Sequence, residues 1–310
     1  MSNLSAPHFH DETAAYEFVE ARVWPEGPIC PHCGGMDRIS PMKGKSTRIG
    51  TYKCYQCRKP FTVKIGTIFE ASNVQMTVWL QAIYLMAASK KGISTHQLHR
   101  TLGVALRTAW FMSHRIREAM REGGLAPFGV DGGIVEADET FIGNDRAKKP
   151  KGQKKGRGYH HKHKVLALVD RDTKRARTMV VDSLAAKDLA PILRENVAKE
   201  ARLMTDEASY YTLVGREFAS HDIVRHGQGE YGRGEIGTNT IEGFFSVFKR
   251  GMKGVYQHCG KKHLHRYAAE FEFRYNHRVA NGYDDLARAD QLIGGFVGKR
   301  LKYRDSLWAS

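Results

Sequence analysis

Two Cys-x-x-Cys pairs near the start of the chain constrain its fold more than any other feature. The pairs are Cys30 with Cys33 and Cys54 with Cys57, and a gap of 20 residues separates them. Two such pairs at this separation supply four thiolates to one tetrahedral Zn²⁺, and the basic, glycine-containing gap forms a strand and a turn between them. We therefore predict a zinc ribbon in this part of the chain.

Other uses of these cysteines fit less well. A thioredoxin-like redox motif needs one Cys-x-x-Cys pair in a βαβ context, and four unrelated buried thiols would not require this spacing. A disulfide framework would leave the fifth cysteine, Cys259, without a mate, so the chain suits a reducing compartment. Aromatic and basic residues around the pairs allow either contact with nucleic acid or a purely structural ribbon, and both alternatives remain open.

The charge of the chain indicates its partner. Lys and Arg number 49 against 33 Asp and Glu, which gives a formal charge of +16 over 310 residues. This excess favours a polyanion, because binding releases counterions from it. An anionic membrane surface is the alternative, but the sequence has no run of about 18 apolar residues and no signal-peptide pattern. We expect nucleic acid as the partner, no membrane attachment, and a cytoplasmic, nucleoid-associated protein.

Helical patterns follow the cysteine pairs. The apolar spacing predicts a buried helix over 77–89 and two further helices over 94–102 and 105–120. A short helix, a glycine-containing turn and a second helix rich in Arg, Thr and His are typical of a helix-turn-helix, whose second helix enters the major groove. A tri-helical core unit has a similar pattern. On the second helix the predicted DNA contacts are Arg107 and Arg115.

A glycine-rich stretch over 123–133 marks a domain boundary, and the pattern then changes from helical to stranded. Three strands, and then helices alternating with strands, predict an α/β domain. The predicted regions are an N-terminal helix and zinc ribbon over 1–72, a helix-turn-helix domain over 73–124, the α/β domain over 125–282, and a C-terminal helix and tail over 283–310.

A basic run follows the first of these strands. Residues 148–164 contain eight Lys or Arg, three His and no acid. Such runs are usually solvated loops, but a run without a compensating acid favours contact with a phosphate backbone. The DNA contacts predicted here are Lys148, Lys149, Lys151, Lys154, Lys155 and Arg157.

Acidic residues interrupt the predicted strand over 134–142. Glu136 and Asp138 share one face of this strand, and Glu139 takes the other. Because acids are disfavoured inside strands, their presence requires a reason.

Two more acids, from later elements, supply that reason. Asp206 ends a short strand, and Glu242 lies on a predicted helix over 237–250, where it shares a face with Asn239 and Lys249. This order of strands brings Asp138, Asp206 and Glu242 together. Such a cluster repels itself unless cations bind, and Mg²⁺ or Mn²⁺ are the hard ions that suit oxygen ligands. Two such ions support an in-line phosphoryl displacement.

Several motifs together resemble the catalytic domain of bacterial insertion-sequence transposases of the DDE type. The motifs are Val135–Gly143, Thr205-Asp206, Thr238–Ser246 with Lys249-Arg250-Gly251, and His263–Tyr267 with Phe273–Asn276. The branch that the chain resembles carries an N-terminal zinc ribbon and a helix-turn-helix, and the resemblance spans residues 15 to 282. It implies an RNase H-like mixed sheet, Mg²⁺-dependent strand cleavage at element ends, and strand transfer by the freed 3′ hydroxyl.

The resemblance also implies roles for single residues. Asp138 and Asp206 match the first two catalytic acids of the family. Members of this branch can use Asn where others use Glu at the third position, and the chain has both Asn239 and Glu242 there. We favour Glu242, because a carboxylate binds a divalent ion better than an amide does. Lys249, with Arg250 beside it, matches a basic residue that related transposases keep for DNA.

We therefore expect a transposase that binds the terminal inverted repeats of its own element and target DNA, as a homo-oligomer on DNA. Two alternatives remain. One is an RNase H-like nuclease that cuts without joining, and the other is a zinc-ribbon regulator that has lost catalysis.

Overall fold

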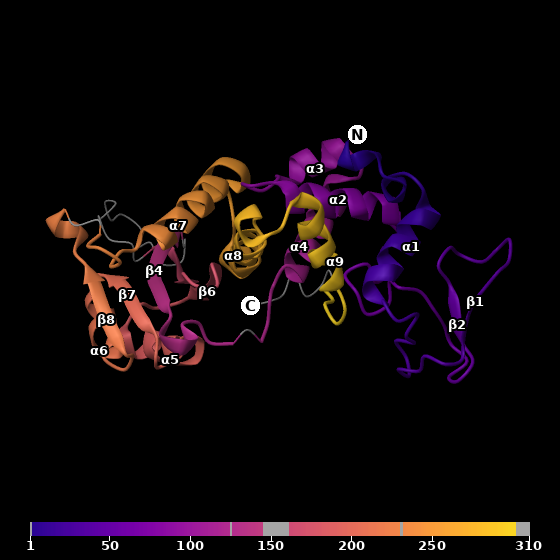
Figure 1. Cartoon of the computed structure of the whole chain (residues 1–310). Coiled ribbons are helices and arrows are strands. Elements are labelled where there is room, and N and C mark those ends of the chain that lie inside the picture. The colour runs from indigo at the N-terminus through magenta and orange to yellow at the C-terminus, as the bar shows by residue number, and fades with distance from the viewer. Residues whose placement is uncertain (1, 125, 145–160, 230–231, 302–310) are drawn as a thin grey trace. The chain divides into compact units, whose positions relative to one another are not determined.

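The computed structural model describes residues 2–124, 126–144, 161–229 and 232–301. The chain divides into two compact units, one made of Met1–Arg121 with Gly282–Ser310 and the other of Glu122–Asn281. Figure 1 labels their helices and strands. The N-terminal segment of the first unit ends at Arg121, before the glycine-rich stretch over 123–133, and the last part of the chain also belongs to the first unit.

The first unit begins with a helix and a small sheet. Helix α1 spans Glu12–Val23, and strands β1 (Ile39–Pro41), β2 (Tyr52–Cys54) and β3 (Pro60–Phe61) form an antiparallel sheet in that order. The core of this part is small and aromatic. The rings of Tyr52 and Phe61 each lie 5.8 Å from the ring of Trp24, measured between centroids.

Helices form the rest of the first unit. They are α2 (Met76–Ala88), α3 (Thr95–Leu102), α4 (Leu106–Ala119) and α9 (Asp285–Gly294). We predicted the C-terminal part as a separate helix and tail, whereas α9 packs against α1 and α2. Leu292 and Ile293 of α9 are buried, and packing against α2 removes their apolar side chains from water. The side chains of Arg22 and Asp290 add an ion pair of 2.9 Å between α1 and α9.

The second unit contains a five-stranded mixed sheet with the strand order β6-β5-β4-β7-β8. Its strands are β4 (Ile134–Ile142), β5 (His163–Asp170), β6 (Arg175–Val181), β7 (Arg202–Asp206) and β8 (Ser220–Val224). Strands β4, β5 and β6 form an antiparallel meander, while β7 pairs in parallel with β4 and β8 in parallel with β7. The predicted RNase H-like architecture is confirmed by this sheet and its helices.

Helices cover both faces of this sheet (Figure 1). On one face, α5 (Ala186–Asn196) and α6 (Thr212–Gly215) pack on alternate strand residues such as Val135 and Ala137. On the other face, α7 (Asn239–Gly251) and α8 (Lys261–Asn276) pack on residues such as Val165 and Ala167. The alternation of strand side chains therefore divides the core into two layers.

Side chains of α8 cover the outer edge of strand β6. The carboxylate of Glu272 accepts hydrogen bonds from the backbone N–H of Thr178 at 2.7 Å and from its hydroxyl at 2.6 Å. The amide of Asn276 accepts from the N–H of Ala176 at 2.7 Å and donates to the carbonyl of the same residue at 3.0 Å. Edge strands otherwise offer these groups to other chains, so the acid and the amide close this edge.

Candidate functional site: a four-cysteine cluster and an acidic cluster

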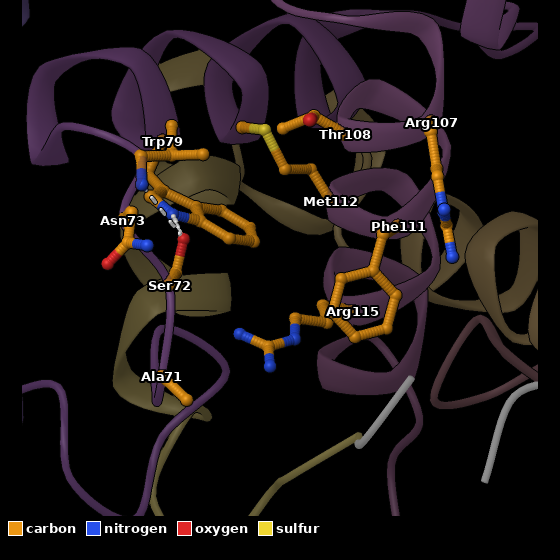
Figure 2. Close-up of a pocket in the computed structure, with 10 residues that line it drawn as sticks. Ala71, Ser72, Asn73, Trp79, Arg107, Thr108, Phe111, Met112 and Arg115 are labelled. Atoms are coloured by element: carbon orange, nitrogen blue, oxygen red, sulfur yellow. Dashed lines mark hydrogen bonds between the residues drawn. The ribbon is translucent and has the colours of Figure 1, made fainter. Parts of the chain in front are cut away.

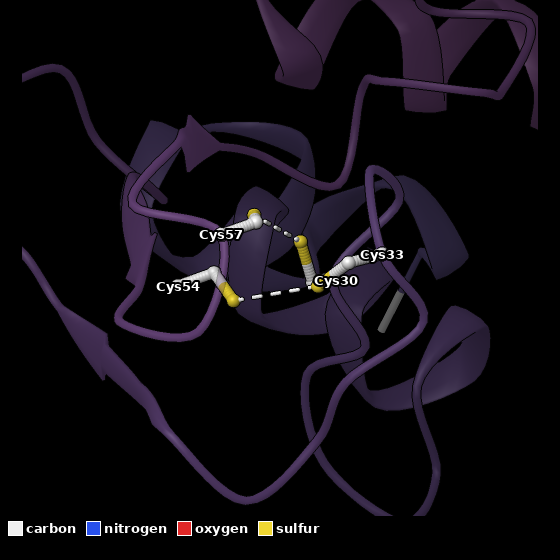
Figure 3. Close-up of side chains that lie close together, drawn as sticks. All are labelled: Cys30, Cys33, Cys54 and Cys57. Atoms are coloured by element: carbon white, nitrogen blue, oxygen red, sulfur yellow. Dashed lines mark hydrogen bonds between the residues drawn. The ribbon is translucent and has the colours of Figure 1, made fainter.

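The four cysteines of the two Cys-x-x-Cys pairs lie together, as predicted (Figure 3). The sulfur of Cys30 is 3.6 Å from that of Cys57, and the sulfur of Cys33 is 3.6 Å from that of Cys54. All four sulfurs lie within 4.8 Å of one another. A tetrahedral zinc with bonds of about 2.3 Å holds its sulfurs about 3.8 Å apart. The cluster therefore has the ligands and spacing of a structural zinc site.

The chain around the cysteines presents them from two turns. The N–H of Cys30 donates to the carbonyl of Gly35 at 3.0 Å, and the N–H of Gly34 donates to the carbonyl of Cys30 at 2.8 Å. Gly34 adopts φ +74, a conformation that glycine reaches without a steric penalty. In the second pair, the N–H of Cys54 donates to the carbonyl of Lys59 at 3.1 Å. Both pairs thus lie at tight turns, and Cys54 ends strand β2.

The predicted recognition helix, α4, follows α3 after a turn in which Gly103 has φ +66. Arg107 lies near its start and lines a cavity of about 510 Å³, together with Trp79 and Phe111 (Figure 2). Arg107 is exposed, and its place at the helix start suits the predicted DNA contact.

Arg115, which we also predicted to contact DNA, is 5% exposed. Its guanidinium donates to the carbonyl of Ile68 at 2.7 Å and to the carbonyl of Leu301 at 3.2 Å. Burial lowers the pKa of this side chain. The structure thus places Arg115 as a link between two segments of the first unit, and we leave it out of the DNA-binding surface. The sequence pattern alone did not indicate which face of α4 is covered.

The predicted DNA contacts on the basic run lie outside the described residues. They are Lys148, Lys149, Lys151, Lys154, Lys155 and Arg157.

Three carboxylates meet at one end of the mixed sheet. Asp138 lies within β4, and Asp206 is the last residue of the neighbouring parallel strand β7. Glu136 pairs with Met204, so Asp138 and Asp206 follow at the same level of the two strands. Oxygens of Asp138, Glu139 and Asp206 all lie within 4.8 Å of one another. Three oxygen donors at this separation suit a divalent cation.

Glu139 was not among the predicted ligands, because we placed it on the opposite face of the strand. Two tyrosines hold its carboxylate in the cluster. The hydroxyl of Tyr210 donates to Oε1 of Glu139, and the hydroxyl of Tyr211, which is fully buried, donates to Oε2 at 3.0 Å. A pair of tyrosines soon after Asp206 is the sequence signal that could have pointed to this contact.

Burial and neighbouring charges favour the protonated forms of two of these acids, Asp138 and Glu139. The pKa of Asp138 is raised from 3.8 to about 7: burial is the largest cause, the charges of Glu139 and Asp206 add to it, and the charge of Lys249 opposes it. Burial also raises the pKa of Glu139. A bound divalent cation would replace these protons, since carboxylates bind metals in their ionised form.

Helix α7 carries the remaining predicted site residues. The carboxylate of Glu242 accepts a hydrogen bond from the hydroxyl of Thr238 at 3.1 Å and lies 3.2 Å from Nε2 of His226. Its side chain is 45% exposed, and in the described parts of the chain it is not grouped with the three clustered acids. Asn239, the first residue of α7, is exposed. His226 is a further neighbour that the sequence did not indicate.

The predicted basic residues of α7 lie near its end. Lys249 and Arg250 are both exposed, and Nζ of Lys249 lies 5.7 Å from the ring centroid of Phe245. The guanidinium of Arg250 donates to the hydroxyl of Ser246 at 3.0 Å. Because the charge of Lys249 lowers the pKa of Asp138, this lysine acts on the acidic cluster from α7.

Across the residues that the structure describes, no helix combines the length and the apolar character needed to cross a membrane.

Comparisons with known proteins agree with these two clusters. Residues 131–276 match the family described as "ISXO2-like transposase domain", and residues 10–60 match "Transposase zinc-ribbon domain". A protein of Halobacterium salinarum, described as "Uncharacterized protein in transposable element ISH50", is 25% identical over 277 residues, which are 86% of this chain and 91% of that protein.

A solved structure is also similar, but only weakly. It is a chain of the structure described as "CryoEM structure of simian T-cell lymphotropic virus intasome in complex with PP2A regulatory subunit B56 gamma", with a TM-score of 0.29, 12% identity, and coverage of 63% of this chain and 65% of that one. That likeness is too weak to support an inference. The two family matches, with the four-cysteine cluster and the acidic cluster inside them, place the chain among the DDE-type insertion-sequence transposases with an N-terminal zinc ribbon.

Proposed function

We propose that the protein cuts DNA at the ends of its own insertion element and joins the freed 3′ hydroxyl to target DNA. The observation that carries this proposal is the meeting of Asp138, Glu139 and Asp206 within 4.8 Å, inside a transposase domain. When bound, a pair of Mg²⁺ or Mn²⁺ ions would activate the attacking oxygen and stabilise the leaving oxygen.

The residues of the site divide the work. Asp138 and Asp206 would hold the metal ions from neighbouring strands, and Glu139 would supply a third carboxylate, which two tyrosines orient. The third family position lies on the first turn of α7, where we favour Glu242 over Asn239 as the metal-binding group. Its exposed carboxylate can leave His226 and Thr238 without unfolding the helix.

Basic side chains bind the DNA in this proposal. Arg107, at the start of α4, and the zinc ribbon bind the element end. Lys249 and Arg250 hold the DNA strand near the acidic cluster. The basic run over 148–164 adds phosphate contacts. The positive charge of the whole chain favours such a polyanionic partner. The active form is a homo-oligomer assembled on the terminal inverted repeats, in the cytoplasm and associated with the nucleoid.

A labelled element end and a target duplex test the proposal. With Mg²⁺, the purified protein should nick the end and then join it to the target. Asp206→Asn should bind the end without cutting it, since an amide neutralises a divalent cation poorly. Asp222→Asn is the matched control, because Asp222 lies on the adjacent strand β8, outside the cluster. Cutting without joining would support the nuclease alternative, and full activity of Asp206→Asn would overturn the proposed site.

A further inference from the structure

Glu136 is an acid buried in the middle of the sheet. Its side chain is 0% exposed and lies on β4, two residues before Asp138 on the same face. A buried carboxylate is costly unless it is paired and hydrogen-bonded. Both of its oxygens are engaged: Oε1 accepts from Nε of Arg171 at 2.5 Å, and Oε2 accepts from the backbone N–H of Ile241 at 2.7 Å. This acid therefore joins the strand that carries Asp138 to the first turn of α7.

Arg171 binds the segment that precedes α7, which contains Glu235 and Gly237. It follows strand β5, and its side chain is 23% exposed. Beyond its bond to Glu136, Nη1 donates to the carbonyl of Glu235 at 2.6 Å and Nη2 donates to the carbonyl of Gly237 at 2.8 Å. The planar guanidinium fork holds its donors in fixed directions. One side chain thus fixes two carbonyls just before α7 relative to the sheet.

The first turn of α7 depends on this long-range contact. Helices begin with N–H groups that have no partner inside the helix, and a side chain close by in the sequence usually accepts one of them. The residue before α7, Thr238, makes no such capping bond. The carboxylate of Glu136 takes this role by accepting the N–H of Ile241. It also brings a negative charge to the end of the helix where the dipole favours one.

We propose that Glu136 and Arg171 are positioning residues of the transposition reaction. They hold the first turn of α7, with Asn239 and Glu242 on it, at a fixed place relative to Asp138. The N–H of Glu242 donates to the carbonyl of Thr238 at 3.0 Å, so the third catalytic position lies inside the turn that the pair anchors. This inference rests on the proposed function, because positioning matters only if the α7 residue acts with the strand acids.

Hydrogen exchange tests the anchor without any need for activity. In Glu136→Gln the side chain offers one oxygen and one NH₂ group, so either Arg171 or the N–H of Ile241 loses its acceptor. We expect the amides of 239–243 to exchange at least tenfold faster than in the original protein. The control is Glu272→Gln, a second buried acid that accepts backbone and side-chain bonds at β6 and whose hydrogen bonds go to Thr178 rather than to α7. Unchanged exchange over 239–243 in Glu136→Gln would overturn the inference.

Single-turnover cleavage tests the consequence for the reaction. With DNA ends saturated by protein, Glu136→Gln and Arg171→Lys should each cut at least tenfold more slowly, with unchanged affinity for the end. Arg171→Lys keeps the charge but loses the fork. Glu272→Gln should cut at the original rate once it is folded. Cleavage within twofold of the original in both pair variants would overturn the inference.

Folding and wild-type activity separate the remaining outcomes. If both pair variants are unfolded at the assay temperature by circular dichroism, the pair is a general stabiliser and the positioning role fails. If the original protein does not cut at all, the proposed function fails, while the exchange comparison still decides whether the pair anchors α7.

Discussion

Metal binding at the acidic cluster should depend steeply on pH. The pKa of Asp138 is raised from 3.8 to about 7, first by burial and then by the charge of Glu139. A divalent ion binds the ionised carboxylate, so the proton on Asp138 must leave first. For a pKa of about 7, the ionised fraction falls from about nine-tenths at pH 8 to about one-tenth at pH 6. The apparent affinity for Mg²⁺ or Mn²⁺ should therefore fall about tenfold over this range.

Calorimetry measures this effect directly. Mn²⁺ is titrated into the protein at pH 6, 7 and 8, each in two buffers with different enthalpies of ionisation, and the difference in heat gives the number of protons released. Asp138 should release about one proton per binding event at pH 6 and almost none at pH 8, and any proton held by Glu139 adds to this number. Asp222→Asn should behave as the original protein does. An apparent affinity that is constant within twofold from pH 6 to pH 8 would refute the reasoning.

Four further results follow from the structure. Removing zinc with a chelator, or replacing Cys33 by Ser, should unfold the ribbon, because its own core is small. Circular dichroism would show the unfolding, and metal analysis should find about one zinc per chain before the metal is removed. A ribbon that stays folded without metal would contradict this prediction. Burial raises the pKa of Glu272 from 4.5 to about 7 in the folded protein. The contribution of Glu272 to folding stability is therefore present below about pH 4.5 and is lost as pH rises towards 7. The thermal unfolding midpoint should decrease over this pH range, and the decrease should be smaller in Glu272→Gln. Glu139→Gln and Glu242→Gln should both slow cleavage by about 10²-fold or more if both carboxylates serve the reaction, and unchanged single-turnover cleavage in either variant would remove that residue from the site. Arg107→Ala should weaken binding of the element end and reduce the slope of log affinity against log salt concentration by about one. Filter binding at several salt concentrations measures this slope. An unchanged slope would exclude a contact between Arg107 and a DNA phosphate.

Local pattern was sufficient for the elements that carry the predicted site. The strand expected over 134–142 is β4, Ile134–Ile142, and the helix expected over 105–120 is α4, Leu106–Ala119. The meeting of Asp138 and Asp206 followed from the order of strands, because parallel neighbours bring equivalent ends together. The cysteine cluster followed from spacing alone, since four thiolates in two tight turns have few other arrangements.

Long-range contacts explain what the sequence did not reveal. The last residue pair between β4 and β7 is Glu136 with Met204, so no residue of β7 pairs with Glu139. Only the folded chain brings Tyr210 and Tyr211 to the carboxylate of Glu139. Arg115 is buried because segments far away in the sequence, at Ile68 and Leu301, cover its face of α4. Neither contact leaves a periodic trace in the sequence.

The covered edge of β6 also limits how copies of this protein can assemble. Glu272 and Asn276 occupy the backbone groups of Thr178 and Ala176 through which a second sheet would extend the first. A continuous sheet shared between subunits is therefore closed off at this end. A second copy of the chain that meets this end of the sheet would therefore contact side chains of α8 rather than the backbone groups of Thr178 and Ala176.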